Sequence, residues 1–265
     1  MSVSPLLQKS LSDQTRSLVA WGIGLASLVA MYAAFYPSVR DSAGALQGYL
    51  EHMPDAVKNL IGGDFTTPAG YLRSETFSTL GPILFLVFAI GSGARAIAGE
   101  EEGRTLDLLL STPIRRAQVL FDKWVAIVVA TLGLSAIMGI TIALVGPAFG
   151  LRVPLSALAA ECLMLFLLGV AFGTIALAVG CYTGRKGLAA GVTGALATVT
   201  YVLNVVAPSV DAIRWLRPAS PFRWYLEPDA LIAGLSVENV MVLVGIAAVA
   251  YVVAAIAFER RDLRA

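Results

Sequence analysis

The sequence predicts an all-helical protein that crosses a membrane six times. Of its 265 residues, 57% are hydrophobic and only 14% are charged, whereas about 25% of residues are charged in a typical soluble domain. Long apolar runs recur along the whole chain, and a span needs about 20 residues because a helix rises about 1.5 Å per residue through about 30 Å of hydrocarbon. We therefore expect residues 1–265 to form a single transmembrane domain.

Six apolar runs define the expected spans, which cover residues 18–36, 77–97, 125–145, 155–181, 188–207 and 240–258. The first run is too long for the apolar core of a cleavable signal peptide, so we expect it to be retained. Before it, Leu6, Leu7 and Leu11 alternate with Lys9 and Arg16. This pattern predicts a short amphipathic helix that lies on the inner leaflet ahead of the first span.

A second amphipathic helix is expected at residues 43–61, between the first two spans. Its apolar positions Leu46, Leu50, Met53, Val57 and Leu60 recur at steps of three and four, and the pair Gly62-Gly63 ends it. It would be either a lid or partner-contacting helix, or a surface helix that covers the ends of the spans.

The later connections differ in length. Residues 182–187 are so few that the fourth and fifth spans should form a tight hairpin, and Gly187, Gly191 and Ala195 then form a face of small residues that permits close helix approach. Residues 208–236 contain several prolines and aromatic residues. They predict either an aromatic belt at the interface or a re-entrant pair of short helices before the sixth span.

The distribution of basic residues predicts the orientation. If the N-terminus is cytoplasmic, twelve of the 19 Lys and Arg residues lie inside. These are Lys9, Arg16, Arg95, Arg104, Arg115, Arg116, Lys123, Arg185, Lys186, Arg260, Arg261 and Arg264. Basic residues concentrate in cytoplasmic loops, so we expect a multi-pass protein of the cell membrane with both termini inside. No basic stripe indicates a nucleic-acid partner.

Catalytic chemistry is not indicated by the sequence. The single histidine, His52, stands alone and is expected to be solvated. Gly91-Ser92-Gly93 lacks a histidine on its own side of the membrane and is interpreted as helix packing. Cys162 and Cys181 fall near opposite ends of the fourth span and are interpreted as packing thiols, with a cross-link between two copies open only to an outward-facing Cys162. No residues have the spacing of metal ligands.

Glu161 is the only acidic residue that could be embedded in a span. A carboxylate in the bilayer would normally mark a proton or substrate path. The fourth run is long enough, however, for its hydrocarbon part to begin after this residue. We therefore expect Glu161 to lie at the headgroup level and to contribute little to turnover.

Residues 99–124 place nine charged side chains between two apolar runs, in the order GEEEGRTLDLLLSTPIRRAQVLFDKW. The apolar run 108–110 is too short to span a membrane. Ser111 or Thr112 followed by Pro113 is a helix start signal. The block therefore predicts a helix, a kink and another helix that project charge from the inner face.

This block resembles the cytoplasmic loop of permease subunits of type-2 ABC exporters, the ABC-2 membrane family. The family pattern is present at Glu101, Gly103, Thr105, Leu106, Leu109, Leu110, Pro113, Arg115 and Lys123. The usual Arg-Gly-Thr order appears as Gly103-Arg104-Thr105, and GDFTTPAGYLRSETF upstream resembles the approach to the second span in bacterial and archaeal members.

The resemblance implies that this loop carries the coupling helix, which docks in a groove of an ATPase. The residues it assigns to coupling are Glu100, Glu101, Glu102, Gly103, Arg104, Thr105, Leu106, Leu108, Leu109, Leu110, Pro113 and Arg115. Charges can orient a soluble partner around an apolar anchor at Leu108–Leu110. A loop that is merely solvated would not need the leucine triplet.

The resemblance implies the membrane subunit of an ATP-driven exporter of a hydrophobic or amphipathic molecule, such as a drug, an antibiotic or a lipid-like compound. Its partners would be two ABC ATPase subunits, a second permease copy or a paralogue, and membrane lipid. The chain has no phosphate-binding Gly-x4-Gly-Lys-Ser/Thr loop, so ATP and Mg would be bound by the partner and this chain would hold no cofactor. A non-transporting membrane scaffold and an ion-coupled secondary transporter remain alternatives.

Overall fold

The computed structural model describes residues 5–42, 67–103 and 115–260, and no strand occurs among them. The described residues form α1 (Pro5–Asp41), α4 (Pro68–Tyr71), η1 (Leu72–Leu80), α5 (Gly81–Ala96), α6 (Ala98–Glu102), α8 (Arg116–Val145), η2 (Gly146–Phe149), α9 (Leu155–Thr183), α10 (Lys186–Val206), η3 (Ala207–Ser209), η4 (Asp211–Ala219), α11 (Pro221–Leu226), α12 (Ala230–Ala233) and α13 (Val237–Arg260). Within this part of the chain, six helices are long and apolar enough to span a membrane, and each expected run lies on one of them. The all-helical, six-span prediction is confirmed.

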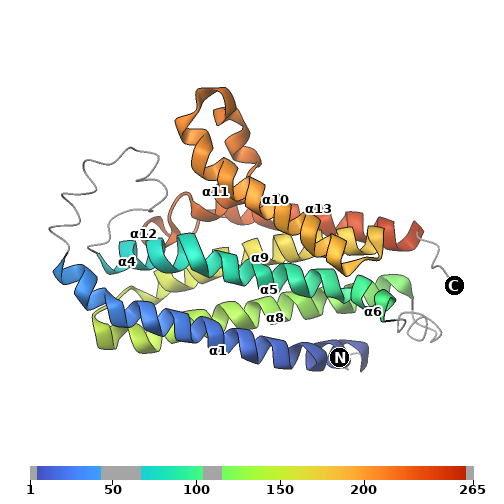
Figure 1. The fold of residues 1–265 in the computed structure, drawn as a ribbon, viewed down its shortest axis with the longest axis horizontal. Helices are drawn as coiled ribbons and strands as arrows, with labels where there is room; N and C mark the ends of the chain where they lie inside the picture. The colour runs from blue at the N-terminus through green and yellow to red at the C-terminus, as the bar shows by residue number, and fades with distance from the viewer. Residues whose placement is uncertain (1–4, 43–66, 104–114, 261–265) are drawn as a thin grey trace.

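The bundle is built around α9, which packs against α5, α8, α10 and α13, and the long helices are drawn in Figure 1. Leu165, Phe172 and Leu177 of α9 are fully buried. Its closest approach is to α5, where a Cβ added at Gly93 would lie 2.0 Å from the carbonyl oxygen of Gly173. The packing interpretation of the Gly91-Ser92-Gly93 triplet is therefore confirmed at Gly93.

The first helix corrects one expectation. α1 is continuous over 37 residues, so residues 6–16 do not form a separate amphipathic helix. Leu6 is buried in an apolar cluster that includes Val119 of α8 and Phe258 of α13. The apolar side of this segment therefore packs on the protein, whereas the sequence pattern alone had suggested that it faces lipid.

The second span begins earlier than predicted, as a π-helix (η1) that follows α4. At its end, a Cβ added at Gly81 would lie 1.8 Å from the carbonyl oxygen of Thr76, so only glycine fits there. Pro82 follows and has no N–H. It cannot bond to the carbonyl of Ser78, its partner in an α-helix, or to that of Phe77, its partner in a π-helix.

Two tyrosines from distant segments satisfy these carbonyls. The hydroxyl of Tyr225 in α11 donates to the Phe77 oxygen at 2.7 Å, and that of Tyr201 in α10 donates to the Ser78 oxygen at 3.4 Å. A buried carbonyl without a partner is costly. The irregular start of the second span is therefore stabilised by residues more than 120 positions away.

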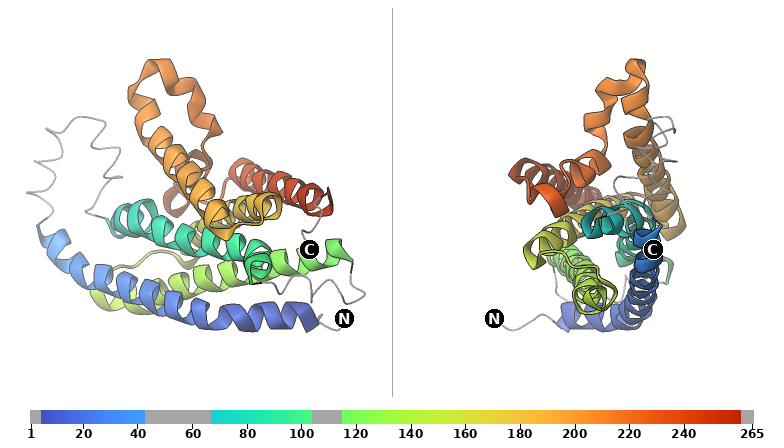
Figure 2. Two further views of the ribbon diagram at one scale, coloured as in Figure 1. Left: turned by 45° about the vertical axis from the view of Figure 1, so that its right-hand side comes forward. Right: turned by 90° about the vertical axis from the view of Figure 1, so that its left-hand side faces the viewer.

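Prolines divide residues 207–236 into short helices, as the sequence predicted. Ser220 caps α11 by accepting from the N–H of Phe222, and Asp229 caps α12 by accepting from the N–H of Leu231. Figures 1 and 2 show that η4 projects from the bundle, while α11 and α12 fold back toward it. That this segment re-enters the membrane stays a prediction.

Glu161 is not at a solvated position. It lies in α9 and only 3% of its surface is exposed, because α12 packs across this part of α9. Protein therefore encloses the carboxyl and keeps it from water and headgroups, while its depth in the membrane stays a prediction. Helix length along the sequence could not reveal this cover.

The hairpin between α9 and α10 is confirmed. α9 ends at Gly184, whose φ of +65° is left-handed, and α10 begins at Lys186. A Cβ added at Gly187 or Gly191 would meet no atom within 4 Å, so the small-residue face of α10 contacts no other described helix there.

Both cysteines are buried thiols outside any disulfide, as predicted for packing residues. The Cys162 sulfur would lie 2.9 Å from a Cβ added at Gly139, which places it in the contact between α8 and α9. The expected helix at residues 43–61 and His52 lie outside the described residues.

Candidate functional site

One end of the bundle gathers the charged residues singled out in the sequence. α1 begins there and α13 ends there, together with α6, the start of α8 and the turn between α9 and α10 (Figures 1 and 2). We call it the termini end. The opposite end, which carries α4, α11 and α12, is called the far end.

The acidic turn at the termini end is tied to two other helices. Glu100 in α6 forms an ion pair with Lys123 in α8, with 2.7 Å between Oε1 and Nζ, and both side chains are mostly buried. Glu102 accepts from the backbone N–H of Lys186 at 2.9 Å. The Lys186 ammonium also lies 3.8 Å from the Glu102 carboxylate. The two acids therefore clamp α6 to α8 and to the first turn of α10.

The clamp frames residues 104–114 from both sides. Gly103 ends α6, and its N–H bonds to the carbonyl of Gly99 at 3.0 Å. Arg115 is exposed immediately before α8, and Arg116 donates to the carbonyl oxygen of Phe258 at 3.3 Å. The described residues that flank the segment are thus held to the bundle.

The predicted coupling residues divide into two groups. Glu100, Glu101, Glu102, Gly103 and Arg115 lie together at the termini end. The others lie outside the described residues: Arg104, Thr105, Leu106, Leu108, Leu109, Leu110 and Pro113.

An apolar cluster lies beneath the clamp. Ile97 at the junction of α5 and α6 packs with Leu120 of α8, Leu177 of α9 and Phe258 of α13, and each is nearly or fully buried. Protein interiors of this kind are close-packed and transmit displacement. A movement of α6 would therefore be passed to three long helices.

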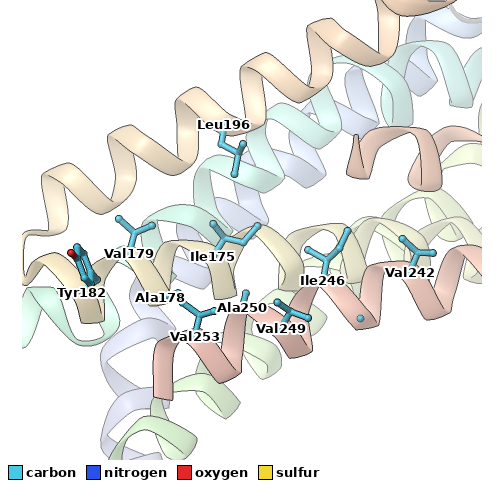
Figure 3. A pocket seen from close by; sticks show the side chains of 11 residues that line it. Ile175, Ala178, Val179, Tyr182, Leu196, Val242, Ile246, Val249, Ala250 and Val253 are labelled. Carbon is cyan, nitrogen blue, oxygen red and sulfur yellow. The ribbon is translucent and has the colours of Figure 1, made fainter. Parts of the chain in front are cut away.

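A groove with an apolar lining runs between α10 and α13, with α9 as its floor. Its volume is about 870 Å³, within the range of small-molecule sites. Figure 3 shows Leu196 of α10 pointing toward Ile175 of α9 and Ile246 of α13. Tyr182 contributes the only polar side-chain atom among the residues of this lining. The groove can accommodate an apolar group and offers few polar contacts.

The comparison with protein families is decisive. The profile described as ABC-2 family transporter protein matches residues 5–263. The chain belongs to this family. No curated protein matches its sequence. As a member of the ABC-2 family it is a multi-pass membrane permease, and its family implies association with ABC ATPase partners.

Sequence reasoning missed the clamp of this ABC-2 permease. Lys123 belongs to the family pattern and Lys186 to the inside charges, but neither lies near its partner acid in the sequence. Glu102 and Lys186 are 84 positions apart. The available signal was that each lysine lies in the first turns of a helix, but the packing of the bundle decides which helices meet the acidic turn.

The clamp leads to a prediction about stability. Lys123→Glu should lower the thermal midpoint of the permease in detergent by several degrees, because two mostly buried carboxylates would then face each other. Adding Glu100→Lys should restore most of the loss. Lys186→Glu, at the more exposed pair, should change the free energy of unfolding by no more than about 1 kcal/mol, and the midpoint accordingly little. Equal losses in the single and the double variant would show that the pair contributes nothing.

Proposed function

We propose that this chain is the membrane subunit of an ATP-driven exporter, in which two permease copies or paralogues work with two ABC ATPase subunits. The observation that carries the proposal is the clamped frame around residues 104–114. In an ABC-2 chain this is the segment that resembles the coupling helix. The residues that flank this segment contact α8, α10 and α13. A movement of the docked segment would therefore be passed to these spans.

The roles of the residues follow from their positions. Leu108, Leu109 and Leu110 would form the apolar anchor in the ATPase groove, and the neighbouring charges of Arg104 and Arg115 would orient it. Glu100 and Glu102 are already engaged within the permease. We therefore assign these two residues to the transmission of movement from the docking segment to the spans.

The termini end is proposed to face the cytoplasm. The excess of Lys and Arg in the segments at this end supports the orientation, and an ATPase that uses cytoplasmic ATP requires it. The far end would then be the side of release.

The proposed cargo is a hydrophobic or amphipathic molecule. The groove between α10 and α13 supports this assignment, because its lining offers almost no polar groups. An ion would find no counter-charge in it. Apolar linings recognise many molecules of similar size, which suits a drug, an antibiotic or a lipid-like compound.

The proposal is tested by co-expression of the tagged permease with a candidate ABC ATPase from the same genome. The ATPase should co-purify, and its hydrolysis in lipid should rise above that of the ATPase alone. A reporter fused after Ala265 should be active as a cytoplasmic fusion. A permease that binds no ATPase would instead fit a membrane scaffold, and transport that follows an ion gradient without ATP would fit a secondary carrier.

A further inference from the structure

The far end contains a second polar cluster, buried between α9, η1 and the short helices α11 and α12. Arg73 of η1 forms an ion pair with Asp229, with 2.5 Å between Nη1 and Oδ2. Its Nη2 donates to the carbonyl oxygen of Leu226 at 2.9 Å. Arg73 therefore holds the α11–α12 segment against the start of the second span.

Glu161 of α9 lies in the same cluster. Its carboxyl is within hydrogen-bonding reach of the Tyr225 hydroxyl and of the Ala230 backbone N–H. Its second oxygen, Oε2, is buried and has no hydrogen-bond partner. A buried carboxylate oxygen without a partner is expensive unless the group is neutral.

The charges of the cluster do not balance when both carboxyls are ionised. Arg73 supplies one positive charge, and it faces Asp229 and Glu161. Asp229 takes the direct ion pair, which leaves Glu161 as the uncompensated group. A single proton on Glu161 makes the cluster neutral.

The other neighbours of Glu161 cannot supply the missing charge. Tyr225 is fully buried, and this burial raises the pKa of its hydroxyl well above the usual value. It therefore stays neutral and can donate to only one acceptor, which is the Phe77 oxygen. Cys162 follows Glu161 in α9, and no charged side chain from the described residues of α8, α10 or α13 acts on Glu161.

The cover over Glu161 is small. α12 has four residues, Ala230–Ala233, and it lies over α9 with Ala230 and Leu231 buried. Ile232 on the same turn is 72% exposed. If the cover moved away, water would reach the Glu161 carboxyl and stabilise its ionised form.

We propose that Glu161 is a proton-binding site that closes the far end: the carboxyl holds a proton while the α11–α12 segment covers it and releases the proton to water when the segment opens. The proton comes from the medium at the far end and returns to it, and only the carboxyl O–H bond forms or breaks. The inference deepens the proposed function, because the segment then acts as a gate on the release side. If Glu161 is part of this gate, it should contribute to turnover, in contrast to the expectation from the sequence.

The sign of the pH dependence follows from linkage. The closed form binds one more proton than the open form, so a rise in pH favours opening. For one proton the closed-to-open ratio changes by up to about tenfold per pH unit.

The test uses the full-length permease alone in lipid nanodiscs, so it does not depend on an ATPase. Cys162 and Cys181 are replaced by Ala, and Leu231→Cys is labelled with a membrane-impermeant maleimide between pH 5 and pH 8. Ile232→Cys is the matched reference, because it is exposed on the same helix and corrects for thiol reactivity. The ratio of the two labelling rates should rise with pH by at least several-fold.

Two further variants separate a proton site from a structural contact. Glu161→Gln keeps the shape but cannot ionise, so the ratio should stay low and flat. Tyr225→Phe removes a hydrogen bond but no titrating group, so the slope should persist even if opening is easier. A flat ratio in the parent, or an unchanged slope in Glu161→Gln, would overturn the proton site. Neither outcome affects ATPase binding at the termini end, which the co-purification experiment tests separately.

Discussion

Loss of the ATPase partner is the expected result of replacing both Leu108 and Leu109 with Asp. If these residues anchor the docking segment, each substitution forces a carboxylate into a desolvated contact, at a cost of several kcal/mol. Two such substitutions exceed what most protein contacts can absorb, since each 1.4 kcal/mol lowers affinity about tenfold. Co-purification of the ATPase with tagged permease, together with ATP hydrolysis in lipid, measures the effect.

Charge reversal at Glu101 or Arg104 provides the matched control. A rim ion pair contributes roughly 0 to 1 kcal/mol, so these variants should retain the partner with weaker binding at high salt. The frame around the segment is held by Glu100, Glu102 and Arg116, which the leucine variant leaves intact, so the permease itself should still insert and keep its thermal midpoint. Full ATPase binding and transport by the double variant would show that Leu108 and Leu109 do not anchor the ATPase.

Gly93→Ala is expected to destabilise the permease strongly, because it adds a methyl group at the main contact between α5 and α9. The new Cβ would lie 2.0 Å from the Gly173 carbonyl oxygen and 3.1 Å from the Ala176 Cβ. Real Cβ atoms do not approach backbone so closely, so α5 and α9 must separate along their main contact. Overpacking of this kind costs about 1–3 kcal/mol or more, and the thermal midpoint in detergent should fall by several degrees.

Gly91→Ala is the control on the same helix. Its added Cβ would meet only the end of the Arg95 side chain, at 3.9 Å. Both substitutions raise helix propensity by the same amount, about 1 kcal/mol, so any difference between them measures packing. Gly91→Ala should leave the midpoint unchanged or slightly higher. Equal midpoints for the two variants would contradict the close approach of α5 and α9.

Hydropathy predicted the spans well because it depends on composition within one helix. All six runs lie on observed helices, and the hairpin at Gly184 follows from the shortness of the connection alone. The start of the second span was missed. Arg73 and Glu75 lower the mean hydropathy there, yet these residues belong to the same helical segment, which begins at Pro68.

The two polar clusters could not be predicted for a different reason. Each joins residues that are far apart in the chain: Glu100 with Lys123, and Arg73 with Asp229 and Glu161. A single sequence reports which side chains are charged but not which of them the packing brings together. Length reasoning placed Glu161 in headgroups because it treats a helix as isolated, whereas α12 covers it.

The tyrosine donors at Phe77 and Ser78 have a consequence for biogenesis. The ribosome completes the second span long before it makes Tyr201 and Tyr225, and until then the carbonyls of Phe77 and Ser78 lack the two hydroxyl donors of the finished fold. An unsatisfied carbonyl costs several kcal/mol in hydrocarbon. The nascent segment is therefore expected to gain these hydrogen bonds only after the last third of the chain emerges. Chains truncated before α11 should expose this segment to membrane quality control, so the C-terminal part of the permease completes a helix that was synthesised near its beginning.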